Sequence, residues 1–325
     1  MEIINIKSKK GVVLETVSED PDYFDLMGVV DVKVWKDWLL FATMKNSGHI
    51  SVFDKSTSKP LGKFLANGNG PGELSETVSF GEISFDGDIT AINDSKGELI
   101  YWDIKTSCET GHTVCLDSIS KVIGAGCLTS IVPVMDNTLA CIRIVKFGQE
   151  RFLYKGGEII VTPTQKTLND VKLSVNDGFR FNMLFGFAAY NKDQKRMVEA
   201  STMLNTIQVY GLDDNFAKTV GIGKRPDDVS YIEKIPLADL PVSFQSLKSF
   251  EFGFGLLYYG TSLQDFQMTR LIKPDILIFD WDGKLVSRYE VPFWLTSFDI
   301  DWDSRIVYGV DLNEDKIYRF ALPEP

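Results

Sequence analysis

Short apolar runs rich in Val, Ile, Phe, Tyr and Trp recur along the whole chain, separated by clusters of Gly, Asn, Asp and Ser. No long segment keeps its apolar residues at the spacing of an amphipathic helix. Apolar runs of about four to eight residues between turn-forming clusters are typical of β-strands. The pattern therefore predicts an almost entirely β protein.

One hairpin pattern occurs four times, as an apolar or aromatic pair, a polar turn and a second strand. The copies are HISVFDKSTSKPLGKF, ELIYWDIKTSCETG, TIQVYGLDDNFAKTV and DILIFDWDGKLVSRY, and they place Asp54, Asp103, Gly211 and Asp280 directly after the pair. A degenerate fifth copy has Lys155 at this position, and a truncated sixth has Arg319. A repeat of roughly 40 to 50 residues with about four short strands is typical of a β-propeller blade. The sequence predicts a six-bladed β-propeller, formed by a single domain over residues 1–325.

The strands of the first blade are predicted over residues 29–34, 38–44, 49–54 and 61–65. The later blades are predicted to begin near Ser79, Cys127, Leu184, Leu247 and Thr296. Two longer inserts, residues 162–180 and 226–246, are predicted to be loops or lids rather than separate domains. The second insert contains PLADLPVSFQSL, for which we expect a short helix.

The sixth repeat stops after its third strand, because the chain ends soon after IYRF. Residues 11–17, GVVLETV, are predicted to supply the missing outer strand. An open ring would leave unpaired strand edges and two blades with one neighbour each. We therefore expect an N-terminal strand to complete the last blade and close the ring.

The segment ANGNGPGELS, residues 66–75, raises the question of a phosphate-binding loop. A Walker loop requires a Lys after its last Gly, and here an acidic residue, Glu73, follows. The dinucleotide fingerprint also fails, because the glycines are evenly spaced and no helical pattern follows. Similar Gly-x-Gly segments, VIGAGCLTS and VGIGKRPDDVS, stand at matching points between blades. The segment is therefore predicted to be a structural corner made by Gly68, Gly70, Pro71 and Gly72.

Loops from all blades of a propeller converge on the face that carries these corners, which makes that face the expected binding surface. Glu73 is a candidate ligand contact there, and the alternative is that it accepts amide protons from its own glycine corner. Lys224 and Arg225, in the corresponding corner of the fourth blade, are candidates for a cationic clamp on an acidic sugar or carboxylate. The alternative for this pair is an exposed loop without a ligand.

Composition supports a folded protein and excludes some partners. Apolar residues make up 44% of the chain and charged residues 24%, as in ordinary globular domains. The net charge is −11 and basic residues form no long run, so nucleic-acid binding is not expected. No stretch reaches the roughly 18 apolar residues of a membrane span, and MEIINIKSKKG lacks the apolar region of a secretory signal. We expect a protein that is soluble as written.

The residues that support catalysis or metal binding are sparse. Neither His49 nor His112 is expected beside a nucleophile where the channel loops converge, so a hydrolase triad is not predicted. The four cysteines show no Cys-x-x-Cys spacing, which favours buried free thiols and leaves a disulfide open. Asp299, Asp301 and Asp303 alternate on one strand, which suggests a channel cation or, as the alternative, an ordinary Asp-Ser turn. The sequence predicts no catalytic residue, no metal site and no cofactor.

Several of these segments resemble the TolB-like six-bladed propeller proteins of Bacteroidetes. The resemblance is carried by GNGPGEL after the first hairpin, by FGFAAYNKDQKRMVEA, and by the ending FDIDWDSRIVYGVDLNEDKIYRFALP. It covers nearly the whole chain, and its most specific part is Gly68 to Glu73. Most members of this family have no known biochemical role, and many resemble exported lipoproteins. The resemblance thus implies a periplasmic or cell-surface location if a signal has been removed.

These observations favour a non-catalytic propeller that presents a loop-built face to a protein or glycan ligand. The alternative is a carbohydrate-active enzyme, a glycoside hydrolase or lyase, that uses carboxylates at the channel mouth. A third hypothesis is an interaction module of a larger surface assembly.

Overall fold

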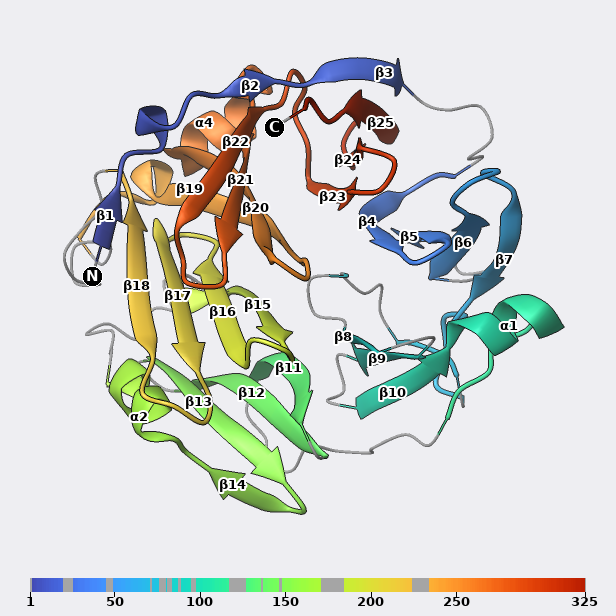
Figure 1. The fold of residues 1–325 in the computed structure, drawn as a ribbon, viewed down its shortest axis with the longest axis horizontal. Helices are drawn as coiled ribbons and strands as arrows, with labels where there is room; N and C mark the ends of the chain where they lie inside the picture. The colour runs from blue at the N-terminus through green and yellow to red at the C-terminus, as the bar shows by residue number, and fades with distance from the viewer. Residues whose placement is uncertain are drawn as a thin grey trace. The chain divides into compact units, whose positions relative to one another are not determined.

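The structure is a computed structural model (Figure 1). It describes residues 2–19, 26–44, 49–70, 72–75, 80, 84–86, 89–94, 98–116, 127–135, 137–145, 148–170, 184–223 and 234–324. The chain divides into two compact units, one made of residues 1–12 and 122–291 and the other of residues 13–121 and 292–325. A single domain over residues 1–325 stays a prediction.

The first unit contains three sheets (Figure 1). The first sheet is β11 (Cys127–Met135), β12 (Thr138–Val145), β13 (Gly148–Lys155) and β14 (Glu158–Ile160). The second is β15 (Gly186–Asn191), β16 (Arg196–Ser201), β17 (Thr206–Gly211) and β18 (Ala217–Ile222), with β1 (Glu2–Ile4) parallel to β18. The third is β19 (Pro241–Ser249), β20 (Gly253–Ser262), β21 (Asp275–Asp280) and β22 (Leu285–Glu290), with β2 (Val12–Val13) beside β22.

The second unit also contains three sheets. They are β4 (Val29–Trp35), β5 (Trp38–Thr43), β6 (Ile50–Asp54) and β7 (Pro60–Phe64); β8 (Ser84–Asp86), β9 (Ile89–Asp94) and β10 (Glu98–Asp103); and β23 (Ser297–Asp301), β24 (Ile306–Asp311), β25 (Lys316–Ala321) and β3 (Glu15–Glu19). Consecutive strands pair antiparallel, as in the blades of a propeller. The fold is an all-β propeller fold, and no described sheet closes on itself.

The cores of both units lie between neighbouring sheets, because both faces of most strands carry apolar residues. In the first unit, Val198 and Val209 pack with Phe254 and Phe279 of the next sheet. In the second unit, aromatic Trp102 of β10 packs with strands β5 to β7. Burial on both faces leaves little of the polar-apolar alternation of a half-exposed sheet, which is why the strands appear in the sequence as continuous apolar runs.

The helices among the described residues are short. They are η1 (Ile6–Ser8), α1 (Ile104–Thr110), α2 (Pro163–Asn169), η6 (Leu237–Asp239) and α4 (Leu263–Met268). Helix α2 begins with a capping box, in which Thr162 and Gln165 exchange side-chain to backbone hydrogen bonds, and has a Pro in its first turn. The first insert, which was predicted to be a loop or lid, thus contains a helix, and TPTQ is its start signal. The second insert contains the expected short helix as η6.

The hairpin repeat located the third strand of each blade. The residues predicted to end that strand are the last residues of β6, β10, β13, β17 and β21, namely Asp54, Asp103, Lys155, Gly211 and Asp280. The aspartates among them recur for a physical reason, since their carboxylates accept hydrogen bonds from backbone amides of the following turn. Thr57 donates to Asp54 at 2.7 Å, and Lys284 donates to Asp280 at 2.8 Å.

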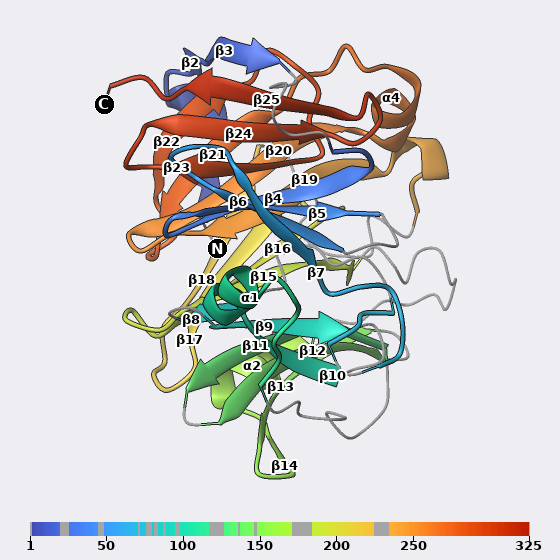
Figure 2. The same ribbon diagram turned by 90° about the vertical axis from the view of Figure 1, so that its right-hand side faces the viewer.

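The N-terminal strand completes the last blade, as predicted. Strand β3 pairs antiparallel with β25 and is the fourth strand of that sheet, as Figure 2 shows. The paired residues, Glu15–Glu19, lie slightly later in the chain than the predicted segment 11–17. Part of that segment forms β2 instead, on the sheet of β19 to β22.

The prediction of six complete blades is wrong: the structure shows five blades of four or more strands, and the sheet of β8, β9 and β10 has three. A helix, α1, follows β10 directly, where the outer strand was expected. The carboxylate of Asp103 caps α1 by accepting from Thr106 N at 2.9 Å, so the chain turns into a helix directly after β10. Of the fourth strand there remains an isolated bridge between Trp102 and Cys115.

The predicted blade starts are correct at β11, close at β15 and β23, and late for the fifth blade. Strand β19 begins at Pro241 rather than near Leu247. Val242 and Phe244 are buried in this earlier part, and the pairing with β20 shifts register on either side of Phe244. The predicted start near Ser79 lies outside the described residues.

Candidate functional site

The glycine corner of residues 66–75 is held by its own acidic residue. Glu73 Oε2 accepts a hydrogen bond from Gly70 N at 2.7 Å, and Glu73 N donates to Gly70 O at 3.0 Å. A Cβ on Gly68 would overlap this carboxylate, and Gly72 has a φ of +74°. The backbone conformation at Gly72 therefore favours glycine, and a side chain on Gly68 would displace the Glu73 carboxylate from its hydrogen bond to Gly70 N. Pro71 lies outside the described residues.

The other predicted ligand contacts, Lys224 and Arg225, also lie outside the described residues. Binding by Glu73, Lys224 and Arg225 stays a prediction. The described part of their corner ends at Gly223, whose φ of +60° is again a glycine conformation.

The alternating aspartates of the last blade contact lysines. Asp299 and Asp301 are buried on β23, and Asp303 lies beyond the end of the strand with an exposed side chain. Asp299 Oδ2 lies 3.1 Å from Lys33 Nζ, and Asp301 Oδ1 lies 3.0 Å from Lys55 Nζ. No group of metal-binding side chains occurs among the described residues. These carboxylates link β23 to the neighbouring blade of the second unit.

The histidines and cysteines do not form a nucleophilic site in the described part of the chain. His49 is buried, whereas His112 is exposed beside the carbonyl of Thr110. Cys108, Cys115 and Cys141 are free thiols. Burial raises their pKa values, to about 11, 11 and 12 respectively. Such thiols carry little of the reactive thiolate at neutral pH.

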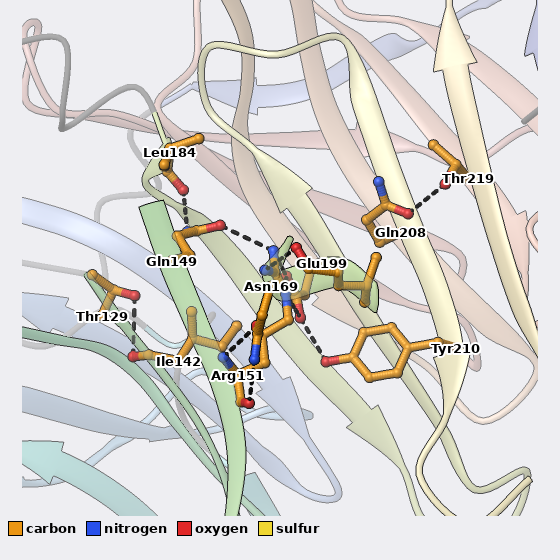
Figure 3. Close-up of polar contacts among 11 residues, drawn as sticks. Thr129, Ile142, Gln149, Arg151, Asn169, Leu184, Glu199, Gln208, Tyr210 and Thr219 are labelled. Carbon is orange, nitrogen blue, oxygen red and sulfur yellow. Dashed lines mark hydrogen bonds and ion pairs between the residues drawn. The ribbon is translucent and has the colours of Figure 1, made fainter. Parts of the chain in front are cut away.

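A polar cleft of about 90 Å³ lies in the first unit, between the sheet of β11 to β14 and the sheet of β15 to β18 (Figure 3). Its walls come from the first residues of β11, β13, β15 and β17 and from the last residues of β16. Chain segments that join one blade to the next arrive at this end of β11 and β15. Its polar lining consists of Thr129, Gln149, Arg151, Glu199, Ser201, Thr206 and Gln208.

Arg151 and Glu199 form the charged centre of the cleft. Arg151 Nη2 lies 2.8 Å from Glu199 Oε2, and Arg151 Nε donates to the same oxygen at 2.8 Å. Tyr210 Oη donates to Glu199 Oε1 at 2.6 Å. The side chains of Arg151 and Glu199 are only 10% and 9% exposed, so solvent screens this pair weakly.

Further hydrogen bonds hold the guanidinium in place. Arg151 Nη2 donates to Gln149 Oε1 at 3.0 Å, and Nη1 donates to Leu168 O at 3.3 Å. Gln149 in turn donates to the carbonyl of Leu184. Asn169, at the end of α2, exchanges two hydrogen bonds with the backbone of Arg151. Helix α2 thus supports the cleft from the side of β13.

The electrostatics of this group fix its protonation. Burial lowers the pKa of Arg151, but the charge and hydrogen bonds of Glu199 outweigh that effect and hold the pKa above its ordinary value. Burial and the negative charge of Glu199 raise the pKa of Tyr210 well above its ordinary value. The cleft therefore contains one cation, one anion and a neutral phenol, with no net charge.

The sequence analysis missed Arg151 and Glu199, although a signal existed. Each is a charged residue in the middle of an apolar strand, in QERFLYK and RMVEAS. A charged side chain at such a position is usually paired when it is buried. Pairing the two would have required knowing that β13 and β16 lie in adjacent sheets.

No family model matches the chain, and no curated protein matches it. Solved structures share its fold. A member of the DUF4221 family from Bacteroides vulgatus has a TM-score of 0.62 and 11% identity, over 96% of this chain and 98% of that one. A protein from Bacteroides fragilis, whose name proposes that it is exported, has a TM-score of 0.54 and 12% identity, over 99% of this chain and 97% of that one.

Raptor from Chaetomium thermophilum is also similar, with a TM-score of 0.52 and 11% identity, and this chain covers 29% of its length. At such low identities the likeness shows the fold alone. Two of the similar structures come from Bacteroides, the group to which the sequence resemblance pointed. None of the described helices has the length and apolar character needed to cross a membrane.

Proposed function

We propose that this protein is a non-catalytic binding propeller whose ligand, a glycan or a protein segment, enters the polar cleft of the first unit. The observation that carries the proposal is the pair Arg151 and Glu199, which lines an open cleft while being almost completely buried. Buried charges are costly, and a well-packed apolar pair would often stabilise a core equally well. Their retention beside a cleft is explained if they orient polar groups for a ligand.

The location of the cleft supports the same function. It lies where the segments between blades reach β11 and β15, which is the side of a propeller blade on which we expected binding residues. Side chains of several strands, rather than one loop, form its walls, so its geometry is rigid. Preformed polar groups of this kind reduce the ordering cost of binding.

A carbohydrate-active enzyme would require two carboxyl groups beside the cleft, one acting as an acid. Glu199 is the one carboxylate among the described lining residues, and Arg151 and Tyr210 occupy both of its oxygens. The described geometry therefore favours binding over glycoside hydrolysis.

Glu73, Lys224 and Arg225 remain proposed ligand contacts outside the cleft. Lys224 and Arg225 would serve an acidic group of the ligand, and Glu73 would combine ligand contact with its role in the glycine corner. The TolB-like resemblance and a periplasmic or cell-surface location belong to this proposal, supported by the similar protein from Bacteroides fragilis whose name proposes export.

Binding arrays test the proposal. Labelled full-length protein is applied to arrays of glycans and of short peptides, alongside Gln208→Trp, which fills the cleft with a larger side chain. The matched control is Gln194→Trp on an exposed turn. We expect ligand signals that Gln208→Trp abolishes and Gln194→Trp retains. If both variants retain every signal, the cleft is not the binding site. A Lys224→Ala/Arg225→Ala variant is expected to lose acidic ligands selectively.

A further inference from the structure

The inference that follows rests on the proposed function and concerns the ligand class of the cleft. We infer that the cleft selects an uncharged, hydroxyl-rich group, namely the terminal ring of a neutral saccharide. Four features of the described lining support this: its charge balance, its unoccupied hydrogen-bond donors, its apolar residues and its size.

Charge balance argues against an ionic ligand. The positive charge of Arg151 is compensated within hydrogen-bond distance by Glu199, at 2.8 Å. A carboxylate or phosphate would have to displace Glu199, leaving a buried anion without its partner. An ammonium group would likewise compete with Arg151. Both exchanges are costly in a buried site, whereas a neutral ligand leaves the pair intact.

The lining still offers donors for a neutral ligand. The Gln208 amide accepts from Thr219 Oγ1 at 2.6 Å through its oxygen, and its NH2 group donates to no described residue. Gln149 uses one N–H for Leu184 O, and Arg151 uses four of its five N–H groups on described partners. Thr206 adds a hydroxyl at the wall. Amide and guanidinium N–H groups that face hydroxyl oxygens are suited to sugar recognition.

Part of the cleft lining is apolar. It includes Leu168, Leu184, Phe187 and Leu204. Sugar rings have C–H faces that pack on aromatic and aliphatic side chains, while their hydroxyl edges need hydrogen bonds. A lining that holds apolar side chains as well as the donors of Gln149 and Gln208 offers contacts to both surfaces of a ring.

The size sets the extent of the ligand. The volume of about 90 Å³ is several times what one water molecule needs, which is on the order of 10–15 Å³. It lies below the roughly 300–1,000 Å³ of sites that enclose drug-sized molecules. A volume of this size admits the edge of one ring rather than a whole ring, and the rest of the glycan would remain in solvent.

The test compares saccharides that share a ring and differ in charge. Full-length protein is titrated with glucose, galactose, mannose and N-acetylglucosamine, and with glucuronate and glucosamine as charged analogues, and binding is followed by saturation-transfer NMR and calorimetry. We expect at least one neutral sugar to bind about tenfold or more tightly than the charged analogues. Glucuronate or glucosamine binding as tightly as the neutral sugars would overturn the inference.

Substitutions assign the binding to the cleft. Gln208→Leu removes the free amide donor and is expected to weaken neutral-sugar binding about fivefold to tenfold, which corresponds to one lost hydrogen bond. Thr219→Val changes the hydrogen-bond partner of Gln208 outside the cleft. This variant is expected to change the affinity for neutral sugars by less than about twofold. If Gln208→Leu fails to fold, the nearly isosteric Thr206→Val replaces it. Unchanged affinity in the cleft variant refutes the sugar assignment.

The two proposals fail differently. The array ligands could be peptides or acidic glycans whose signal is lost in Gln208→Trp. That result would support the binding function and refute the neutral-saccharide assignment. Array ligands that persist in Gln208→Trp would refute both. The absence of binding by any saccharide refutes the assignment as well.

Discussion

Arg151 on β13 and Glu199 on β16 form an ion pair between two neighbouring sheets of the first unit, with N–O distances of 2.8 Å and with Tyr210 donating to the same carboxylate. The pair joins two blades at the wall of the cleft. Because removal of one partner leaves the other charge buried and unpaired, the two side chains depend on each other. The stability of the interface between these blades therefore depends on both residues together.

Single substitutions in this pair should be strongly destabilising. Arg151→Met or Glu199→Leu is expected to lower the free energy of unfolding by about 3 to 5 kcal/mol, because each leaves an uncompensated buried charge. The double variant is expected to cost less than the sum of the two. Urea denaturation of the wild type, both single variants and the double variant measures the coupling. Additive costs would show that the two side chains act independently.

The glycine corner predicts a second coupling, between Gly68 and Glu73. Gly68→Ala should destabilise the protein because its Cβ would overlap the Glu73 carboxylate. Glu73→Ala alone should cost about 1 to 3 kcal/mol, since it removes the charged acceptor of Gly70 N. In the double variant the overlap is gone, so the Gly68→Ala cost should shrink. Thermal unfolding of all four proteins tests this. A Gly68→Ala cost that is the same in both backgrounds would contradict the geometry.

Local patterns predicted the strands well where the signal lay within a few residues. The aspartates that end β6, β10 and β21 cap their own turns, so the residue type and the structure are linked over three or four positions. The need of β25 for an outer partner strand likewise followed from the truncated last repeat.

Predictions failed where one local signal competed with another. Asp103 can end a strand or cap a helix, and the sequence IKTSCET after it formed α1 instead of the outer strand. Strand β19 begins at Pro241, before the predicted start of the fifth blade, and its first residues contain two register shifts. The cleft depends on contacts between Arg151 and Glu199, which are distant in sequence, and no local pattern shows which blades pack together. The sequence consequently predicted the blades better than the site.

The turn after β6 predicts a pH dependence of stability. Hydrogen bonds from the Ser56 and Thr57 side chains, together with the Thr57 amide, lower the pKa of Asp54 from 3.8 to about 2. The unfolded chain therefore takes up this proton at a higher pH than the folded protein does. The stabilising effect of ionised Asp54 is fully present above about pH 4 and is lost as the pH falls toward 2.

Asp54→Asn removes this titration. Between pH 4 and pH 2 the free energy of unfolding of the wild type is expected to fall more steeply than that of Asp54→Asn, when both are followed by urea denaturation at each pH. The control is Asp193→Asn, because Asp193 is an exposed aspartate in the turn before β16. Parallel curves for the wild type and Asp54→Asn would contradict the effect.

The free thiols of Cys108, Cys115 and Cys141, of which Cys141 is buried and the other two are half-buried, predict slow chemical labelling. Burial raises the pKa values of Cys108 and Cys115 to about 11 and that of Cys141 to about 12, so the thiolate fraction at pH 8 is roughly a thousandth or less. In a Cys127→Ser background, a disulfide reagent at pH 8 is expected to react at least about tenfold more slowly with the folded protein than with the protein in urea. Equal rates in both states would show that these thiols are accessible and ionised.

Deleting strand β1 alone and deleting β1 to β3 together are expected to affect the stability of the protein to different extents. Strand β1 adds three residues to the edge of β18, and Ile3 remains largely exposed there. Strand β3, in contrast, covers the edge of β25, where Tyr318 and Phe320 are buried. Deleting residues 1–4 should therefore change stability little, whereas deleting residues 1–19 should expose apolar surface and an unpaired edge.

Hydrogen exchange and light scattering distinguish the two truncations. For the deletion of residues 1–4, we expect protection of the amides in β25 to match that of the full chain. For the deletion of residues 1–19, we expect that protection to be lost and the protein to associate through the open edge, because unpaired strand backbones readily pair with other chains. If the longer deletion left β25 protected and the protein monodisperse, β3 would be dispensable for the last blade.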